Sequence, residues 1–166
     1  MPIDPNRRTF ILTASAFGSA VAGASGMAFA NVTPSTEAGA HAIMMLNAAC
    51  GDDQSPNVFE PPILRVNVGD VVTFVPTDEG HNTASRRGMI PEGAEAWNGG
   101  IDEAVTMELT VPGVYGYVCT PHYEVGMVGL IVVGDDLSNL EAVRAVRQRG
   151  QARTAFHELF DELEVD

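Results

Sequence analysis

Residues Cys119 to Met127 read C-T-P-H-Y-E-V-G-M, and this stretch lies between two apolar segments. It places a thiol, an imidazole and a thioether within one short loop. One Cys thiolate, two His nitrogens and a distant Met are the ligands of a trigonal copper site of the electron-transfer kind. The loop supplies three of these four ligands, namely Cys119, His122 and Met127. We therefore expect the rest of the chain to act as a scaffold for this loop.

We expect the second His ligand to come from another part of the chain, which the fold brings next to the loop. His81, in Gly80-His81-Asn82, follows the apolar stretch 71–75, and a strand there would deliver it to one end of a sheet. Asn82 could donate a hydrogen bond to the Cys119 sulfur, whereas Pro121 has no N–H with which to compete. Zinc is the alternative metal, but a structural zinc site would use a fourth strong ligand in place of Met127.

Composition limits the possible functions. The 166 residues include 45% hydrophobic and 19% charged residues, which favours a compact fold over a disordered chain. The formal net charge is −13, and all nine basic residues are Arg. Such a surface repels phosphate backbones, so we expect no nucleic-acid partner.

The two cysteines leave one open question. If Cys119 is a metal ligand, Cys50 is unpaired; the alternative is a Cys50–Cys119 disulfide in an oxidising compartment. If Cys119 formed a disulfide, His122 and Met127 would have no metal to bind in common with it. The sequence therefore favours a ligand role for Cys119.

The N-terminus has the pattern of an export signal. Arg7 and Arg8 precede a mildly apolar run over 10–29, and Ala28 and Ala30 supply the small residues before a cleavage site. We expect a twin-arginine-type signal over 1–30, a flexible lead-in over 31–39 and one domain over 40–166. This predicts a periplasmic protein without stable membrane association once the signal is removed; an uncleaved anchor is the alternative.

The middle of the chain alternates between short apolar segments and turns. We expect strands over 41–49, 64–68, 71–75, 105–111, 114–119 and 128–133, with turns at 51–57 and 112–113 and an irregular segment over 86–96. Seven or eight such strands indicate an all-β antiparallel sandwich over 40–134.

From Asp136 the apolar period becomes helical. Ser138 and Glu141 form a possible capping box, and two apolar stripes predict two helices within 136–164, separated at Gly150. We expect the helices to pack on a face of the sandwich; a partner-binding helix is the alternative.

The chain resembles the pseudoazurins, of the cupredoxin superfamily. The resemblance rests on M-L-N at 45–47, V-F-E-P at 58–61, V-G-D-V-V-T-F-V-P at 68–76, G-H-N at 80–82, M-I-P-E-G-A-E at 89–95 and the 119–127 loop. It implies a cupredoxin-like Greek-key β-sandwich of about eight strands, with two C-terminal α-helices packed on it. It also implies one type 1 copper ion bound by His81, Cys119, His122 and Met127.

The resemblance further implies a monomeric periplasmic carrier of single electrons. Its expected partners are redox proteins, with copper nitrite reductase as a possible acceptor and cytochromes as possible donors. The implied contact surface is an apolar patch around His122, made of Met89, Ile90, Pro91, Pro121 and Met127. Pseudoazurins typically surround this patch with lysines, and this sequence has none; only Arg86 and Arg87 lie near it in sequence. We therefore expect partner binding to depend chiefly on apolar contacts.

Two other classes of function fit the sequence less well than electron transfer. A copper carrier or storage protein needs exposed, exchangeable ligands, and the Met44-Met45 pair supports it only weakly. An enzyme needs a second metal centre that binds substrate, and only His41 and His157 remain, near opposite ends of the mature chain. The sequence therefore predicts that the protein is not an enzyme.

Overall fold

The computed structural model describes residues 38–165. The predicted signal over 1–30 and nearly all of the predicted lead-in lie outside the described residues. The described chain forms eight strands, one 3-10 turn and two helices. In chain order these are β1 (Ala40–Ala49), β2 (Asp52–Glu60), β3 (Ile63–Val66), β4 (Asp70–Pro76), β5 (Ala84–Ser85), β6 (Val105–Leu109), β7 (Gly113–Val118), η1 (Tyr123–Val125), β8 (Val128–Val133), α1 (Leu140–Arg144) and α2 (Ala152–Val165).

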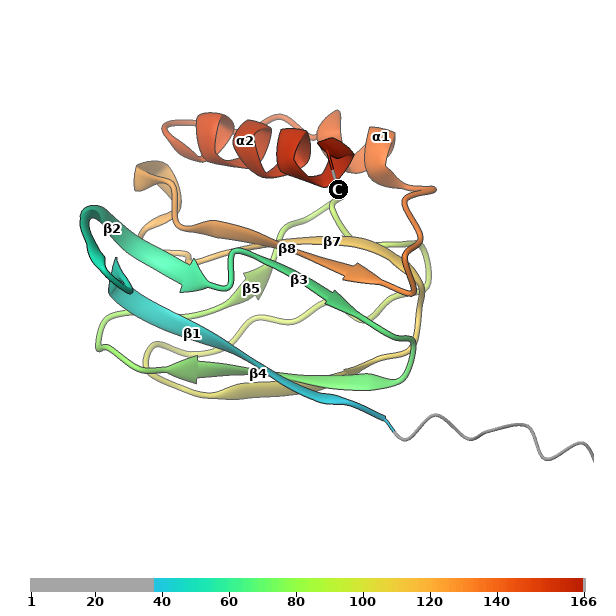
Figure 1. Cartoon of the computed structure of the whole chain (residues 1–166), viewed down its shortest axis with the longest axis horizontal. Coiled ribbons are helices and arrows are strands. Elements are labelled where there is room, and N and C mark those ends of the chain that lie inside the picture. Colours follow the sequence, from blue (N-terminus) through green and yellow to red (C-terminus); the bar gives the residue numbers. More distant parts are fainter. Residues whose placement is uncertain (1–37, 166) are drawn as a thin grey trace, which may run out of the picture. The chain divides into compact units, whose positions relative to one another are not determined.

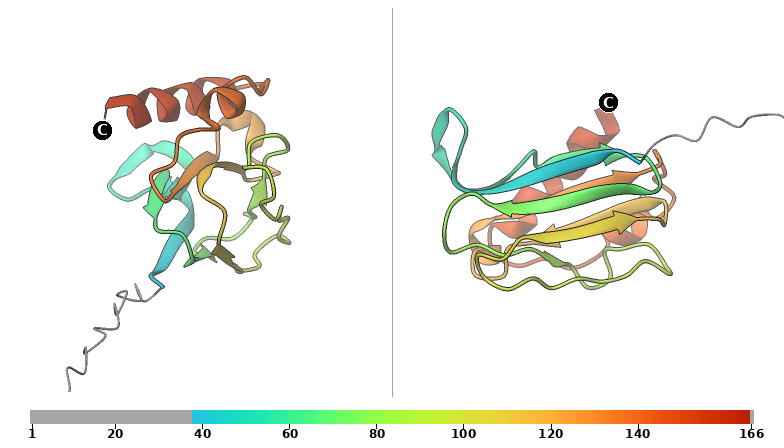
Figure 2. Two further views of the ribbon diagram at one scale, coloured as in Figure 1. Left: turned by 90° about the vertical axis from the view of Figure 1, so that its right-hand side faces the viewer. Right: turned by 90° about the horizontal axis from the view of Figure 1, so that it is seen from below.

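The strands form two four-stranded sheets, which confirms the predicted β-sandwich. One sheet has the order β2-β1-β4-β6, and the other has the order β3-β8-β7-β5. Figure 2 shows β1 and β4 side by side in the first sheet. The prediction of a purely antiparallel sandwich was wrong, because β1 pairs with β4 and β3 pairs with β8 in parallel. These parallel pairs arise where a strand joins a neighbour that is distant in sequence.

Strands β7 and β8 are buried along their whole length. Their inner face packs on an aromatic core that includes Phe59, Phe74 and Tyr117. Their outer face packs against apolar side chains of both helices, such as Val143 and Phe156. This double burial explains why the two segments are continuously apolar, whereas a strand with one solvent face alternates.

Both helices lie on the same side of the sandwich, over β7 and β8 (Figure 1). The packing confirms that the helices cover a face of the sandwich. The capping-box prediction was wrong: Asn139 is the N-cap of α1 and makes no side-chain cap bond. Its amide instead pairs with β7, accepting from Val114 N (2.8 Å) and donating to Val114 O (2.9 Å). None of the helices within residues 38–165 is long and apolar enough to span a membrane.

Two segments differ from the expected pattern. The predicted turn at 51–57 is largely strand, because β2 extends the hairpin that it forms with β1. The short strand β5 was not expected; it pairs with β7 at Val118 and Tyr117. Both differences reflect partner strands rather than local propensity, which depends more on context for strands than for helices.

A buried carboxylate fixes the start of β1. Asp70, only 1% exposed, accepts hydrogen bonds from Gly39 N (2.6 Å), Asn67 N (2.8 Å) and His41 Nε2 (3.0 Å). The two backbone N–H groups, together with His41, lower the pKa of Asp70 below its usual value, against the effect of burial. Asp70 therefore ties the first strand to the turn that precedes β4.

Candidate metal centre

The two sheets bring the predicted ligand residues to one end of the sandwich. Cys119 directly follows β7, and Met127 directly precedes β8. His122 is the N-cap of η1 between them, and His81 follows the turn after β4. The loop is closed by Cys119 N to Met127 O (3.0 Å) and by Met127 N to His122 O (3.1 Å). The two strands thus fix both ends of the loop.

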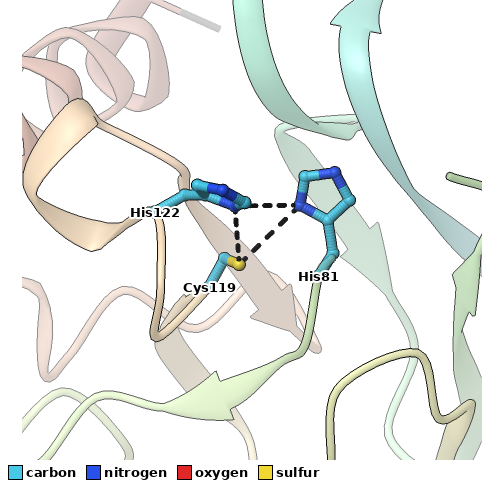
Figure 3. A group of neighbouring side chains, drawn as sticks. All are labelled: His81, Cys119 and His122. Atoms are coloured by element: carbon cyan, nitrogen blue, oxygen red, sulfur yellow. Dashed lines mark hydrogen bonds between the residues drawn. The ribbon is translucent and has the colours of Figure 1, made fainter. Parts of the chain in front are cut away.

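Three donor atoms converge on one point (Figure 3). The Cys119 Sγ lies 3.8 Å from His81 Nδ1 and 3.5 Å from His122 Nδ1, and the two nitrogens are 3.1 Å apart. A triangle with these sides has a circumscribed radius of about 2.0 Å, close to the usual 2.0–2.3 Å between a first-row divalent metal and nitrogen or sulfur. The residues present therefore fit a metal ion of copper size.

Burial separates one of the four predicted ligand residues from the others. His81 and Cys119 are 0% exposed and Met127 is 1% exposed, whereas His122 is half-buried. Met127 belongs to the same buried cluster as Cys119. The imidazole of His122 is thus the part of the centre that lies nearest to solvent.

The electrostatics favour a cation between these groups. Burial lowers the pKa of His81, with a further contribution from the neighbouring His122, so its nitrogen stays neutral and able to donate electrons. Burial raises the pKa of Cys119, partly offset by the backbone N–H groups of Asn82 and His122. A buried thiol of this kind loses its proton readily only when a positive ion is bound beside it.

His81 is oriented by a residue that the sequence analysis missed. Its Nε2 lies 3.0 Å from Asn47 Oδ1, which can only accept a hydrogen bond. The proton therefore lies on Nε2, and Nδ1 keeps its lone pair for a metal. Asp102 fixes the backbone, because its Oδ1 accepts from Gly80 N (2.6 Å) and its N–H donates to His81 O (2.7 Å).

The two predicted outer residues lie beside the centre. The Asn82 side chain donates to Gly99 O (3.0 Å) and Thr120 Oγ1 (3.2 Å) and accepts from Thr120 N (2.7 Å). It is thus the backbone N–H of Asn82, not its side chain, that acts on the Cys119 sulfur. Pro121 is exposed and follows Thr120 in the loop.

The predicted contact patch needs correction. Met89 is 0% exposed, and Pro91 and Met127 are also buried, so these three side chains are not at the surface. Met89 fills the space above Gly116, where an added Cβ would lie 2.5 Å from its Cε. Only Ile90, half-buried, and Pro121, exposed, remain from the predicted patch. Val125, 48% exposed in η1, is an apolar surface residue of the loop that the sequence analysis missed.

The fold also gathers basic side chains beside the loop. Arg86 lies over the Tyr123 ring, 4.9 Å from its centroid. Arg149 reaches the same residue, because its N–H donates to Tyr123 Oη (3.1 Å). Of the arginines in the described residues, all but Arg65 fall at 86–87 or within 144–153. Arg149 is therefore added to the two arginines near the loop that sequence proximity indicated.

The fold and this centre define a class of protein, the single-copper cupredoxins. A family model described as copper binding proteins of the plastocyanin/azurin family matches residues 24–134. Both cysteines are free thiols, which agrees with a ligand role for Cys119 rather than a disulfide.

Known relatives narrow the class. The chain is 42% identical over 116 residues to a pseudoazurin of Paracoccus pantotrophus, covering 70% of this chain and 78% of that one. It is 37% identical over 123 residues to a pseudoazurin of Methylorubrum extorquens, covering 74% and 81%. The solved pseudoazurin of Sinorhizobium meliloti superposes with a TM-score of 0.72 at 45% identity, covering 75% of this chain and 96% of that one.

The chain belongs to the pseudoazurin family. It is therefore a type 1 blue copper electron carrier that works with redox partner proteins, and it is not an enzyme.

Proposed function

We propose that His81, Cys119, His122 and Met127 hold the single type 1 copper ion of this electron carrier. The observation that carries the assignment is the triangle of three donor atoms, with sides of 3.1, 3.5 and 3.8 Å. Bound copper supplies the one-electron chemistry by alternating between Cu(I) and Cu(II). Two imidazoles, one thiolate and the thioether of Met127 would hold the ion in both states.

The surroundings of the ligands support electron transfer over copper storage. Asn47 and Asp102 hold His81 from two sides. Cys119 is fixed by its backbone bond to Met127. Ligands held in this way move little between oxidation states, which favours fast electron transfer. A carrier or storage protein would need ligands that exchange with those of another molecule.

The ligand assignment is tested by the visible spectrum of the copper-reconstituted protein. We expect Cys119→Ser to abolish the intense charge-transfer colour, because the thiolate is its source. The matched control is Cys50→Ser, which removes the exposed second thiol and is expected to keep the colour. A blue Cys119→Ser protein would refute the assignment.

We further propose that electrons leave through the half-buried ring of His122 and that Pro121, Val125 and Ile90 form the apolar contact around it. Pro121 and Val125 are exposed beside His122 in the loop. Arg86 and Arg149 border this surface on the side of the helices: the Arg86 guanidinium lies over the Tyr123 ring, and the backbone N–H of Arg149 donates to Tyr123 Oη. The exposed carboxylate of Glu124 lies in the same loop. At ordinary ionic strength the Debye length is about 8–10 Å, so charges this close to the loop act on a docked partner more strongly than charges elsewhere on the surface. The proposed acceptor is an acidic-surfaced reductase such as copper nitrite reductase, and a cytochrome is a possible donor.

The partner proposal is tested by the rate of electron transfer to copper nitrite reductase at increasing salt. Because the fold brings Arg149 beside Tyr123, this proposal replaces the expectation, drawn from the sequence, of a chiefly apolar contact. We expect the rate to fall with salt, and the double charge reversal Arg147→Glu/Arg149→Glu to lower it by about tenfold at low salt. Arg65→Glu is the matched control, because Arg65 lies on β3 and pairs with Asp135 at 3.8 Å. A rate that responds neither to salt nor to the double reversal would refute the role of the arginines, and the apolar contact alone would then account for partner binding.

The proposed location is the periplasm, reached through the twin-arginine-type signal over 1–30, where the protein acts as a monomer. The support is the Arg7-Arg8 pair ahead of an apolar run. Replacing both by Lys should leave the protein in the cytoplasmic fraction of a Gram-negative host. Export of that variant at the normal level would contradict the signal assignment.

A further inference from the structure

The outer side of the copper loop is held by the segment that joins α1 to α2. Figure 1 shows η1 below the N-terminal end of α2. The Gln151 N–H donates to Glu124 O at 2.9 Å. Gly150 has a φ of +57°, and an added Cβ would lie 2.6 Å from Glu124 O, so only glycine allows this approach without displacement. The segment therefore lies in direct contact with the turn that follows His122.

One side chain in this segment connects three parts of the protein. Gln148 Oε1 accepts hydrogen bonds from Tyr123 Oη (2.8 Å) and from Arg86 Nε (3.2 Å). Its Nε2 donates to Met89 Sδ (2.9 Å) and to Val146 O (3.0 Å). The amide thus uses both its oxygen and its nitrogen, and it is half-buried where it does so.

Tyr123 is the residue through which this contact reaches the metal centre. Its hydroxyl donates to Gln148 and accepts from Arg149 N (3.1 Å) and Arg86 Nη2 (3.4 Å). Its ring lies under the Arg86 guanidinium, 4.9 Å from centroid to Cζ. His122 precedes Tyr123 in the chain and is the most exposed of the four proposed ligand residues, so less of its surface is fixed by packing.

We propose that Gln148 is a positioning residue for the copper loop: by binding Tyr123, Arg86 and Met89 together, it holds the His122 imidazole in place between oxidation states. The inference rests on the proposed ligand role of His122. It assigns a function to the C-terminal segment, which lies beyond residues 24–134 of the copper-binding family match. Networks of this kind, in which each polar atom has a partner, restrict motion more than single bonds do.

The first test uses the metal-free protein and so does not depend on copper ligation. Hydrogen–deuterium exchange is measured for the amides of residues 123–127, three of which bond within the loop. We expect Gln148→Leu, which keeps the size but loses every amide bond, to speed this exchange by about tenfold, the factor for net loss of one hydrogen bond. Gln148→Glu keeps the acceptor for Tyr123 and Arg86 and should restore most of the protection.

The matched control is Gln151→Leu. Gln151 is exposed, and its side-chain amide bonds to no residue within 38–165, so exchange of the loop should stay within about twofold of the parent. Unchanged loop exchange in Gln148→Leu would overturn the proposal. Exchange that rises equally across the whole domain would also overturn it, because Gln148 would then act only on global stability.

The second test uses the copper-loaded protein. We expect Gln148→Leu to lower the rate of electron self-exchange by about threefold or more while the blue colour remains, because a mobile His122 must be repositioned at each transfer. If the copper-loaded parent protein were not blue, the ligand assignment would be overturned instead. Failure of the ligand assignment and failure of the positioning role are therefore distinguishable. A self-exchange rate equal to that of the parent would overturn the positioning role.

Discussion

Tyr117 and Tyr115 allow a paired test of the core beneath the copper centre. Both lie on β7 and face the same aromatic core, with 0% and 2% of their surface exposed. The Tyr115 hydroxyl donates to Val111 O at 2.6 Å, whereas the Tyr117 hydroxyl has no hydrogen-bond partner among the described residues. It packs on Gly129, where an added Cβ would lie 2.3 Å from Oη. Burial accordingly raises the pKa of Tyr117 far above its usual value.

The two hydroxyl deletions should change stability in opposite directions. A buried polar group without a partner costs about 1–3 kcal/mol, and some packing is lost with the oxygen, so we expect Tyr117→Phe to stabilise the fold by about 1 kcal/mol. Tyr115→Phe removes a made hydrogen bond and should destabilise it by about 1 kcal/mol. For a domain of this size the corresponding shifts in Tm are about 3–5 °C, upward and downward.

The assay is urea and thermal denaturation of the metal-free protein, which keeps copper binding out of the comparison. A rise in the urea midpoint with an unchanged slope identifies a change in stability alone. Loss of stability in Tyr117→Phe comparable to that in Tyr115→Phe would refute the reasoning, because the Tyr117 hydroxyl would then have a partner.

Three further perturbations test separate parts of the structure. Asn47→Leu removes the acceptor that fixes the His81 tautomer, and it should weaken copper binding by about 10–100-fold in a chelator competition; an unchanged affinity would dismiss Asn47 as an orienting residue. Met127→Gln should keep the blue colour and lower the reduction potential, since a harder axial ligand favours Cu(II), and about 59 mV corresponds to tenfold in the equilibrium; an unchanged potential would remove Met127 from the coordination sphere. Asp70→Asn should destabilise the fold. Because the folded pKa of Asp70 is lowered, its ionised form stabilises the fold above the unfolded pKa of about 3.9, and this is lost as pH falls through the folded pKa. The urea midpoints of parent and variant should therefore differ at pH 7 and converge in acid. A difference that stays constant with pH would show that the ionised carboxylate of Asp70 is not its source.

The sequence predicted those parts of the site that depend on local order. Cys119, His122 and Met127 lie within one short loop, and the apolar strands on either side fix its ends. His81 could be added because a strand end delivers it to the same edge. The buried strands and the two helices were likewise visible in their apolar patterns.

The sequence could not show contacts that depend on strand pairing across long separations. Asn47 reaches His81 from 34 residues away, because β1 pairs with β4 in parallel. Gln148 reaches Met89 across 59 residues by way of the helices. Met89 itself was assigned to the surface because the family resemblance implied an apolar patch around His122, and its burial depends on the missing side chain of Gly116. In each case the deciding neighbour is remote in sequence.

We propose that two imidazole nitrogens and one thiolate hold the copper ion in this protein. X-ray absorption at the copper edge of the reconstituted protein measures this directly. We expect two nitrogen neighbours and one sulfur neighbour at about 2.0–2.3 Å from the metal. A first shell made only of nitrogen and oxygen, without a short sulfur distance, would contradict the account.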